Sequence, residues 1–202
     1  IKRIVGPYQD SYSPNGIIGE KDACGVGFIA NIKGVESNWI LKQSLKGLNC
    51  MEHRGGCGGD SDSGDGAGIL CSIPWEYLEE KMNLKNTKES NRGLGMIFMP
   101  NKKEKIEECK SICEEEAKKL RINKTSWRTV PVNNEILGPL AKANAPFISQ
   151  WILFINKKDN DDIEKILFQL RKRIEKKVRE SFKNHVGDCE FYFASLSSKT
   201  VV

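Results

Sequence analysis

One long amphipathic segment, residues 161–182, places the strongest constraint on how this chain can fold. Its apolar residues recur at helical spacing and form one stripe: Ile163, Ile166, Leu167, Leu170, Ile174, Val178 and Phe182. Acidic residues lie in its first turn and basic residues in its second half, which suits the dipole of a helix. A helix with a single apolar face buries that face against another element. The sequence therefore predicts a layered domain.

Shorter apolar patterns surround this helix. The sequence predicts strands at residues 25–32, 69–73, 95–99, 127–132, 147–155 and 189–195. It predicts further helices at residues 37–51, from Pro74 (with proline at the first helical position), at 102–120 and around 135–142. Strands and helices do not alternate strictly, which favours an α+β domain over a doubly wound parallel sheet.

Composition excludes several classes of protein. Hydrophobic residues make up 39% and charged residues 29% of the 202 residues, a balance typical of one soluble globular domain. The net charge of +5 comes from interspersed acids and bases, without the basic and aromatic cluster expected of a nucleic-acid binder. No apolar run approaches the roughly 20 residues of a membrane span. We therefore expect neither nucleic acid nor a membrane as partner.

The cysteines are spread along the chain without a CxxC pair, which argues against a zinc ribbon or a thioredoxin-like motif. Their odd number, without a signal peptide, indicates reduced thiols in a reducing compartment. Most lie in apolar-periodic segments, and we interpret these as small core residues: Cys50, Cys71, Cys109, Cys113 and Cys189. Cys24 and Cys57 differ because glycines surround them.

Two glycine-containing motifs resemble ligand sites but fail on inspection. Gly25 and Gly27 fit the dinucleotide pattern G-x-G-x-x-[GA], but no strand precedes them and no helix can follow before Gly34. Residues 60–66 resemble a calcium loop, but no register places a ligand, glycine and glutamate as an EF-hand requires. We expect a conformational, site-forming loop in which Asp and Ser satisfy backbone N–H groups.

Cys24 offers a nucleophile that can carry its own base. If residues 1–23 are removed, its α-amino group, which titrates near 8, can accept the thiol proton. Gly25 and Gly27 would then let a substrate approach the backbone. An alternative is a papain-like pair in which His53 activates a cysteine.

Three segments together resemble one known family. Residues 24–31 (CGVGFIAN), 51–58 (MEHRGGCG) and 64–70 (GDGAGIL) are similar to the glutaminase domain of the glutamate synthase large chain, a class II glutamine amidotransferase. The long glycine loop between Arg54 and Asp65 resembles glutamate synthase more than the purine or glucosamine enzymes. Further matches lie at residues 73–75, 95–100, 127–132, 170–176 and 191–200.

This resemblance implies a four-layer αββα sandwich of the N-terminal-nucleophile type, incomplete in this fragment. It implies that residues 1–23 are a leader that is removed, and that residues 24–202 are the N-terminal part of the amidotransferase domain. Cys24 is then the catalytic nucleophile. Arg54, Gly25, Gly27 and Asp65 are implied to support the site. The resemblance implies no metal in this segment.

The resemblance also implies a reaction. L-glutamine is hydrolysed to glutamate and ammonia through a cysteine thioester, and the ammonia passes to the amination of 2-oxoglutarate in downstream synthase domains. FMN and an iron–sulfur cluster are implied for the full-length enzyme, with electrons from a partner subunit or ferredoxin. A cytoplasmic or plastid location is compatible with reduced thiols.

The chain lacks an initiator Met and ends at Val202, so we expect a fragment of a longer protein. The glutamine-clamping arginine and the oxyanion-hole segment of the family would lie beyond Val202, and we expect this piece alone to hydrolyse glutamine poorly or not at all. Two alternatives remain beside the His53 pair: another class II amidotransferase with a different ammonia acceptor, and a degenerate module that keeps the fold without catalysis.

Overall fold

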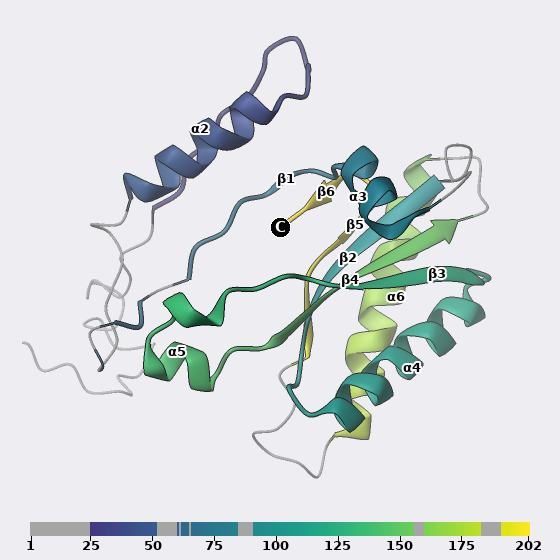
Figure 1. Cartoon of the computed structure of the whole chain (residues 1–202). Coiled ribbons are helices and arrows are strands. Elements are labelled where there is room, and N and C mark those ends of the chain that lie inside the picture. Colours follow the sequence, from purple (N-terminus) through teal and green to yellow (C-terminus); the bar gives the residue numbers. More distant parts are fainter. Residues whose placement is uncertain are drawn as a thin grey trace, which may run out of the picture.

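The computed structural model describes residues 25–51, 60, 62–64, 66–84, 91–155, 160–182 and 191–202. Its elements in chain order are α2 (Asn38–Asn49), β1 (Cys71–Ser72), α3 (Trp75–Met82), β2 (Asn91–Met99), α4 (Lys103–Lys119), β3 (Lys124–Thr129), the 3₁₀-helix η2 (Asn134–Ile136), α5 (Pro139–Ala143), β4 (Phe147–Ile155), α6 (Asn160–Ser181), β5 (Tyr192–Ser197) and β6 (Thr200–Val201). Helices and antiparallel strands are mixed, which agrees with the predicted α+β class (Figure 1).

A four-stranded antiparallel sheet in the order β3-β4-β2-β5 is the centre of the fold. Its middle strands β2 and β4 pair along their whole length, from Asn91 opposite Ile155 to Met99 opposite Phe147. Side chains on a strand alternate between the two faces of the sheet. Residues 149–155 of β4 are nevertheless all buried, because other elements cover both faces.

Helices α4 and α6 lie side by side on one face of this sheet (Figure 1). The apolar stripe predicted for residues 161–182 packs against that face, as expected, with Leu167, Leu170 and Ile174 fully buried. Helix α4 contributes Cys109 and Cys113, which are buried core residues as predicted. This helix–sheet interface forms the larger of the two hydrophobic clusters.

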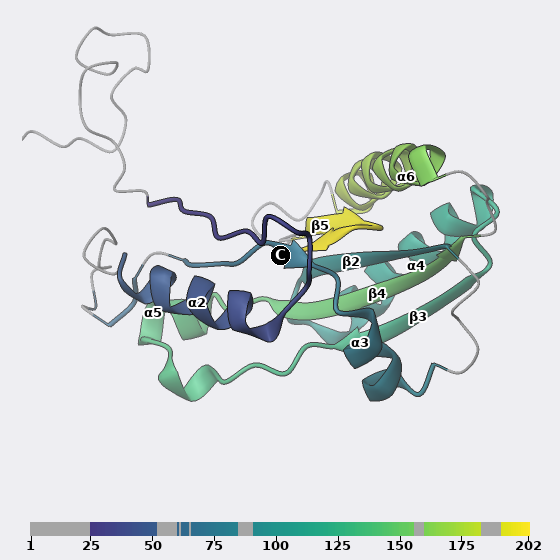
Figure 2. The same cartoon turned by 90° about the horizontal axis from the view of Figure 1, so that it is seen from above.

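The opposite face of the sheet packs against α3 and a two-stranded antiparallel ladder of β1 and β6, in which Cys71 lies opposite Val201. Leu94 and Ile152 of the central strands meet Leu78 of α3 here. Figure 2 shows α6 and α3 on opposite sides of the sheet. The described residues thus form a helix layer, a sheet and part of a second sheet.

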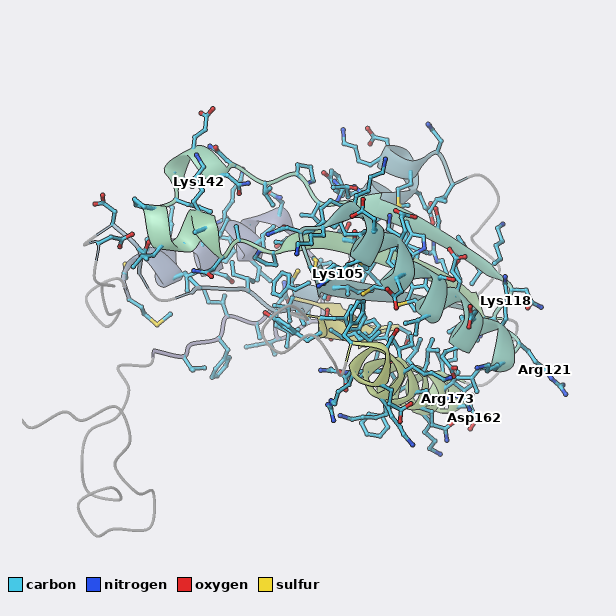
Figure 3. All side chains as sticks on the ribbon, turned by 90° about the horizontal axis from the view of Figure 1, so that it is seen from below. Lys105, Lys118, Arg121, Lys142, Asp162 and Arg173 are labelled. Atoms are coloured by element: carbon cyan, nitrogen blue, oxygen red, sulfur yellow. The ribbon has the colours of Figure 1, made fainter. Side chains whose placement is uncertain are left out.

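A buried carboxylate links α4 to α6. Glu116 of α4 is 2% exposed, and its Oε2 accepts a hydrogen bond of 2.7 Å from Nε of Arg173 on α6. Lys119 donates to the other carboxylate oxygen. Burial by itself raises the pKa of Glu116, but the hydrogen bonds and charges of Lys119 and Arg173 outweigh it and leave that pKa below its usual range. Figure 3 shows Arg173 on α6.

Residues 25–32, predicted as a strand, form none. Val26, Phe28 and Ile32 are exposed by 90% or more, and these residues pair with no strand in the described part of the chain. A strand needs a neighbour to satisfy its N–H and C=O groups, so apolar alternation alone does not create one.

Other boundaries also differ from the sequence prediction. The helix expected around 135–142 is divided into η2 and α5, because Pro139 takes the first position of a new helix after Gly138. Pro74, expected at the first helical position, is the N-cap of α3. Strand β3 begins three residues earlier than predicted and ends before Pro131, whose nitrogen cannot donate. The short strand β6 was not predicted.

Helix α2 lies where it was predicted, but it buries none of its residues. Trp39 and Leu45 are 64% and 47% exposed. Cys50, which follows the helix, is exposed instead of packed in the core, which corrects its interpretation as a core residue. Cys189 lies outside the described residues. Among those described, no helix is both long and apolar enough to span a membrane.

Candidate functional site

Three of the five predicted site residues, Cys24, Arg54 and Asp65, lie outside the described residues, as does the alternative base His53. Gly25 and Gly27 lie in the irregular segment that precedes α2. A Cβ atom built on Gly27 would meet nothing within 4 Å, so the described surroundings do not require glycine there.

Helix α2 leads the chain toward the segment that contains His53 and Arg54. Its N-cap is Ser37, whose side chain accepts a hydrogen bond from the N–H of Ile40. The helix ends at Asn49, directly before the MEHRGG sequence. This agrees with the helix predicted at residues 37–51.

The far end of the glycine-rich loop is attached to α5. The carboxylate of Asp60 accepts hydrogen bonds from the backbone N–H of Ser63 (2.8 Å) and from its hydroxyl (2.7 Å). The same carboxylate accepts the N–H of Leu140 at 2.9 Å, and Oγ of Ser63 accepts the N–H of Ala141 at 3.0 Å. Leu140 and Ala141 lie in the first turn of α5, where backbone N–H groups lack partners within the helix. Residues 60 and 63 thus cap a helix nearly eighty residues away.

Gly138 explains why the cap comes from a distant loop. It is the N-cap residue of α5 and makes no side-chain hydrogen bond. A Cβ atom built on Gly138 would lie 2.6 Å from the carbonyl carbon of Asp62 and from the nitrogen and Oγ of Ser63. The backbone of the loop therefore occupies the place of a side chain. We call this contact the loop–α5 junction, comprising Asp60, Ser63, Gly138, Leu140 and Ala141.

The hydrogen bonds of the junction favour ionised Asp60. The N–H of Leu140 and the side chain of Ser63 lower the pKa of Asp60 to about 2. The group is therefore a carboxylate at every pH near neutrality. A charged acceptor makes stronger hydrogen bonds than a neutral one.

Helix α5 is itself fixed relative to the central sheet. Asn101, which follows β2, donates from its side chain to the carbonyl of Ala145, just after α5. Strand β4 begins two residues later and pairs with β2. Figure 3 shows Lys142 of α5 at the opposite end of the molecule from Arg121, which follows α4. The loop is thus tied to one end of the sheet through α5.

Several residues in the family-like motifs have structural partners. Arg92 of β2 lies over the ring of Trp75, 4.3 Å from its centroid, and pairs with Glu79. Arg128 of β3 donates a 2.8 Å hydrogen bond to the side chain of Gln150. The contacts of Arg92 join α3 to β2, and the hydrogen bond of Arg128 joins β3 to β4, so packing explains part of the 73–75 and 127–132 matches.

Sequence reasoning did not find the loop–α5 junction. The pattern predicted that Asp and Ser of residues 60–66 satisfy backbone N–H groups. It did not indicate that these N–H groups belong to α5. The available signal was Gly138 before Pro139, a helix start without a capping side chain of its own. Within the described part of the chain, no group of three or more His, Cys, Asp or Glu residues could hold a metal ion.

Comparison with known proteins gives the family. The model of "Glutamine amidotransferases class-II" matches residues 24–202. The chain is 41% identical over 97% of its length to a chloroplastic ferredoxin-dependent glutamate synthase of Oryza sativa. It is 42% identical over 92% of its length to ferredoxin-dependent glutamate synthase 1, chloroplastic/mitochondrial, of Arabidopsis thaliana. It is 39% identical over 92% of its length to ferredoxin-dependent glutamate synthase 2 of Synechocystis.

In each case the chain spans about 12% of the length of the relative. The family match includes every segment on which the resemblance was based, and it includes the loop–α5 junction. The predicted class, an α+β domain of the N-terminal-nucleophile type, is confirmed by this match together with the antiparallel sheets. This chain belongs to the class II glutamine amidotransferase family.

Proposed function

We propose that this chain is the glutaminase segment of a glutamate synthase and that Cys24 is its nucleophile. The match of the family model over residues 24–202, which begins at Cys24, carries this proposal. The identity of about 40% to ferredoxin-dependent glutamate synthases, over nearly the whole chain, supports the choice of glutamate synthase among class II enzymes.

In the proposed reaction the thiolate of Cys24 attacks the side-chain amide carbon of L-glutamine. The α-amino group of Cys24 accepts the thiol proton and delivers it to the departing ammonia. The resulting γ-glutamyl thioester is hydrolysed by water, which yields glutamate and restores the thiol. Arg54 would brace carbonyl groups of the glycine-rich loop through its planar guanidinium, without taking part in the chemistry. Gly25, Gly27 and Asp65 would support the site.

This mechanism requires the removal of residues 1–23, because only then does Cys24 carry a free α-amino group. The deciding experiment is the intact mass and N-terminal sequence of the full-length protein purified from its own cells. A chain that begins at Cys24 and hydrolyses glutamine supports the proposal. An active glutaminase that retains the leader would overturn it and make His53 the base to test. A retained leader on an inactive protein favours a zymogen or the degenerate module.

For the whole protein, we propose that the released ammonia aminates 2-oxoglutarate with electrons from ferredoxin. The relatives are described as ferredoxin-dependent, the Oryza sativa protein as chloroplastic and the Arabidopsis thaliana protein as chloroplastic/mitochondrial, which favours a plastid over the cytosol. For the full-length protein we also propose FMN and an iron–sulfur cluster, as the resemblance to glutamate synthase implies.

Another class II amidotransferase is the second candidate, since the family match alone does not specify the ammonia acceptor. The two differ in one assay. Purified full-length protein, supplied with glutamine, 2-oxoglutarate and reduced ferredoxin, forms two glutamates per glutamine if it is a glutamate synthase. Another amidotransferase forms only one under the same conditions.

A further inference from the structure

We propose that the outward face of α6 is a docking surface for an acidic patch elsewhere in the full-length polypeptide, and that this contact holds the glutaminase segment against the rest of the protein. The inference rests on the proposed function only in taking this chain as one segment of a longer enzyme. It concerns a surface that neither the family match nor the relatives' names assign.

The outward side of α6 carries almost only positive charge. Its apolar stripe packs against the sheet, and the opposite side faces away from the molecule (Figure 2). Among the exposed residues of α6 that the structure describes, six are basic and Glu180 alone is acidic. The formal net charge of this side, +5, equals that of the whole chain. We call it the basic face of α6, and its members are Lys165, Lys172, Arg173, Lys176, Lys177 and Arg179.

Most cations of the basic face have no acidic partner within this chain. Lys172 pairs with the half-buried Glu175, and Arg173 pairs with the buried Glu116. Within the described part of the chain, no ion pair involves the other four members of the face. Their charges are therefore available to a partner.

This arrangement of charges works against the stability of the helix itself. Like charges three or four residues apart on a helix are neighbours and destabilise it. Lys176 lies four residues after Lys172 and three before Arg179. Lys177 lies four residues after Arg173. An acidic partner would replace this repulsion by attraction, whereas salt in the solvent only screens it.

The chemistry of the basic face fits a protein surface better than a nucleic acid or a membrane. Phe168 is 60% exposed on this side, and the ammonium of Lys172 lies 5.8 Å from the centroid of its ring. Aromatic side chains are enriched at protein interfaces. One aromatic ring does not provide the series of stacking side chains that single-stranded nucleic acid uses. The apolar stripe of α6 is already packed against the sheet and cannot enter a lipid surface.

The length of the relatives favours an occupant within the same polypeptide. This chain spans about 12% of the length of each relative. A tethered surface meets the basic face at an effective concentration in the millimolar range. Exposed ion pairs are individually weak, so a contact built from them is occupied more readily within one polypeptide than between separate proteins. The acidic patch therefore belongs to the part of the full-length protein outside this chain.

The test is zero-length cross-linking of the purified full-length protein. A carbodiimide joins a lysine amine to a carboxylate only where the two are in contact, and mass spectrometry identifies the joined peptides. We expect the four lysines of the basic face to be joined to Asp or Glu residues outside residues 1–202. Lys142 of α5, which is exposed and far from Arg173 in Figure 3, gives the background yield.

Two matched variants separate charge from the loss of reactive amines. Lys176→Glu/Lys177→Glu reverses two charges, whereas Lys176→Arg/Lys177→Arg keeps both charges and removes the same two amines. The cross-links of Lys165 and Lys172 are read in each. Their yield should fall about 5-fold or more in the Glu variant and stay within about 2-fold of the wild type in the Arg variant. Raising the salt from about 0.05 to about 0.5 M should lower the wild-type yield as well. Hydrogen exchange of α6 checks that both variants keep the helix.

The docking surface is overturned if the wild type forms these cross-links no more than Lys142 does, or if both variants lose them equally. It is also overturned if the joined carboxylates belong to a second copy or to a separate protein, or if the cross-links form only after nuclease treatment, which makes nucleic acid the occupant. Glutamine hydrolysis is measured on the same preparation. An active enzyme without the cross-links overturns the docking surface alone. A cross-linked protein that does not hydrolyse glutamine overturns the proposed function and still supports the contact.

Discussion

Nε of Arg173 donates a 2.7 Å hydrogen bond to Oε2 of Glu116, whose side chain is almost completely buried between the two helices of the outer layer. A buried carboxylate is costly unless it is paired and hydrogen-bonded. Arg173 thereby connects α6 to α4 by a polar contact beside the apolar cluster, and Ser181 of α6 makes a second one by donating to Glu108 of α4. Arg173 belongs to the 170–176 segment on which the family resemblance partly rested, so its role there is structural.

Arg173→Ala should loosen the contact between α4 and α6. Glu116 keeps Lys119 as a partner, and the side chain of Arg173 is 46% exposed. We therefore expect a loss of about 1 to 2 kcal/mol in the free energy of local opening, between the values for surface and buried pairs. Hydrogen exchange of peptides from both helices in the full-length protein measures it. Lys177→Ala, an exposed position on the same helix, is the control. Equal effects of both changes would contradict this role.

Gly47→Ala should stabilise α2. Gly47 lies inside the helix, and a Cβ atom there would meet nothing within 4 Å. Alanine is favoured over glycine in helix interiors by up to about 1 kcal/mol. We expect slower hydrogen exchange in residues 38–49. Unchanged or faster exchange would show that an added Cβ atom at residue 47 does meet neighbouring atoms.

Gly93→Ala, unlike Gly47→Ala, should destabilise the protein. A Cβ atom on Gly93 would lie 2.9 Å from both terminal carbons of Leu167, so α6 would have to shift or Leu167 change its rotamer. Overpacking of this kind costs about 1 to 3 kcal/mol. Faster exchange in β2 and α6 is expected. The double variant Gly93→Ala/Leu167→Ala has room for the added methyl group, because alanine at residue 167 is smaller than leucine. It should therefore regain part of the stability that the clash costs, which would not happen if alanine simply weakened the strand.

The stability of the loop–α5 junction should depend on pH only in the acidic range. The pKa of Asp60 is lowered from 3.8 to about 2 in the folded chain. A depressed pKa contributes stability that is fully present above pH 3.8 and disappears as the pH falls through about 2. Exchange at Leu140 and Ala141, corrected for the intrinsic rate, should therefore be constant from pH 5 to 8. An opening that grows between pH 6 and 5 would indicate a different group.

The cysteines should differ sharply in reactivity. Cys50 is exposed, whereas Cys113 is buried and its burial raises the pKa of its thiol well above the usual value. Iodoacetamide should alkylate Cys50 within the native protein and Cys113 only after unfolding. Mass spectrometry of peptides taken over time distinguishes them. Early alkylation of Cys113 would show that α4 opens from the sheet.

The elements that the sequence predicted well are those with a long and regular pattern. Strand β4 matches its predicted range, and α4 and α6 match within one residue at each end. Their apolar spacing is a local property and fixes both the type of element and its buried face. The failures are short or depend on distant partners, such as residues 25–32 and β6.

The sequence by itself determined the class of domain, the buried stripe of α6 and, through motifs at residues 24–31, 51–58 and 64–70, the family. Only the tertiary structure decided that Asp60 and Ser63 cap α5 and that Gly138 makes room for them. The physical reason is that the first kind of information is local in the sequence and the second is not. Helix and strand periodicity is written in neighbouring residues, whereas a hydrogen bond between residues 60 and 140 exists only after the chain has folded.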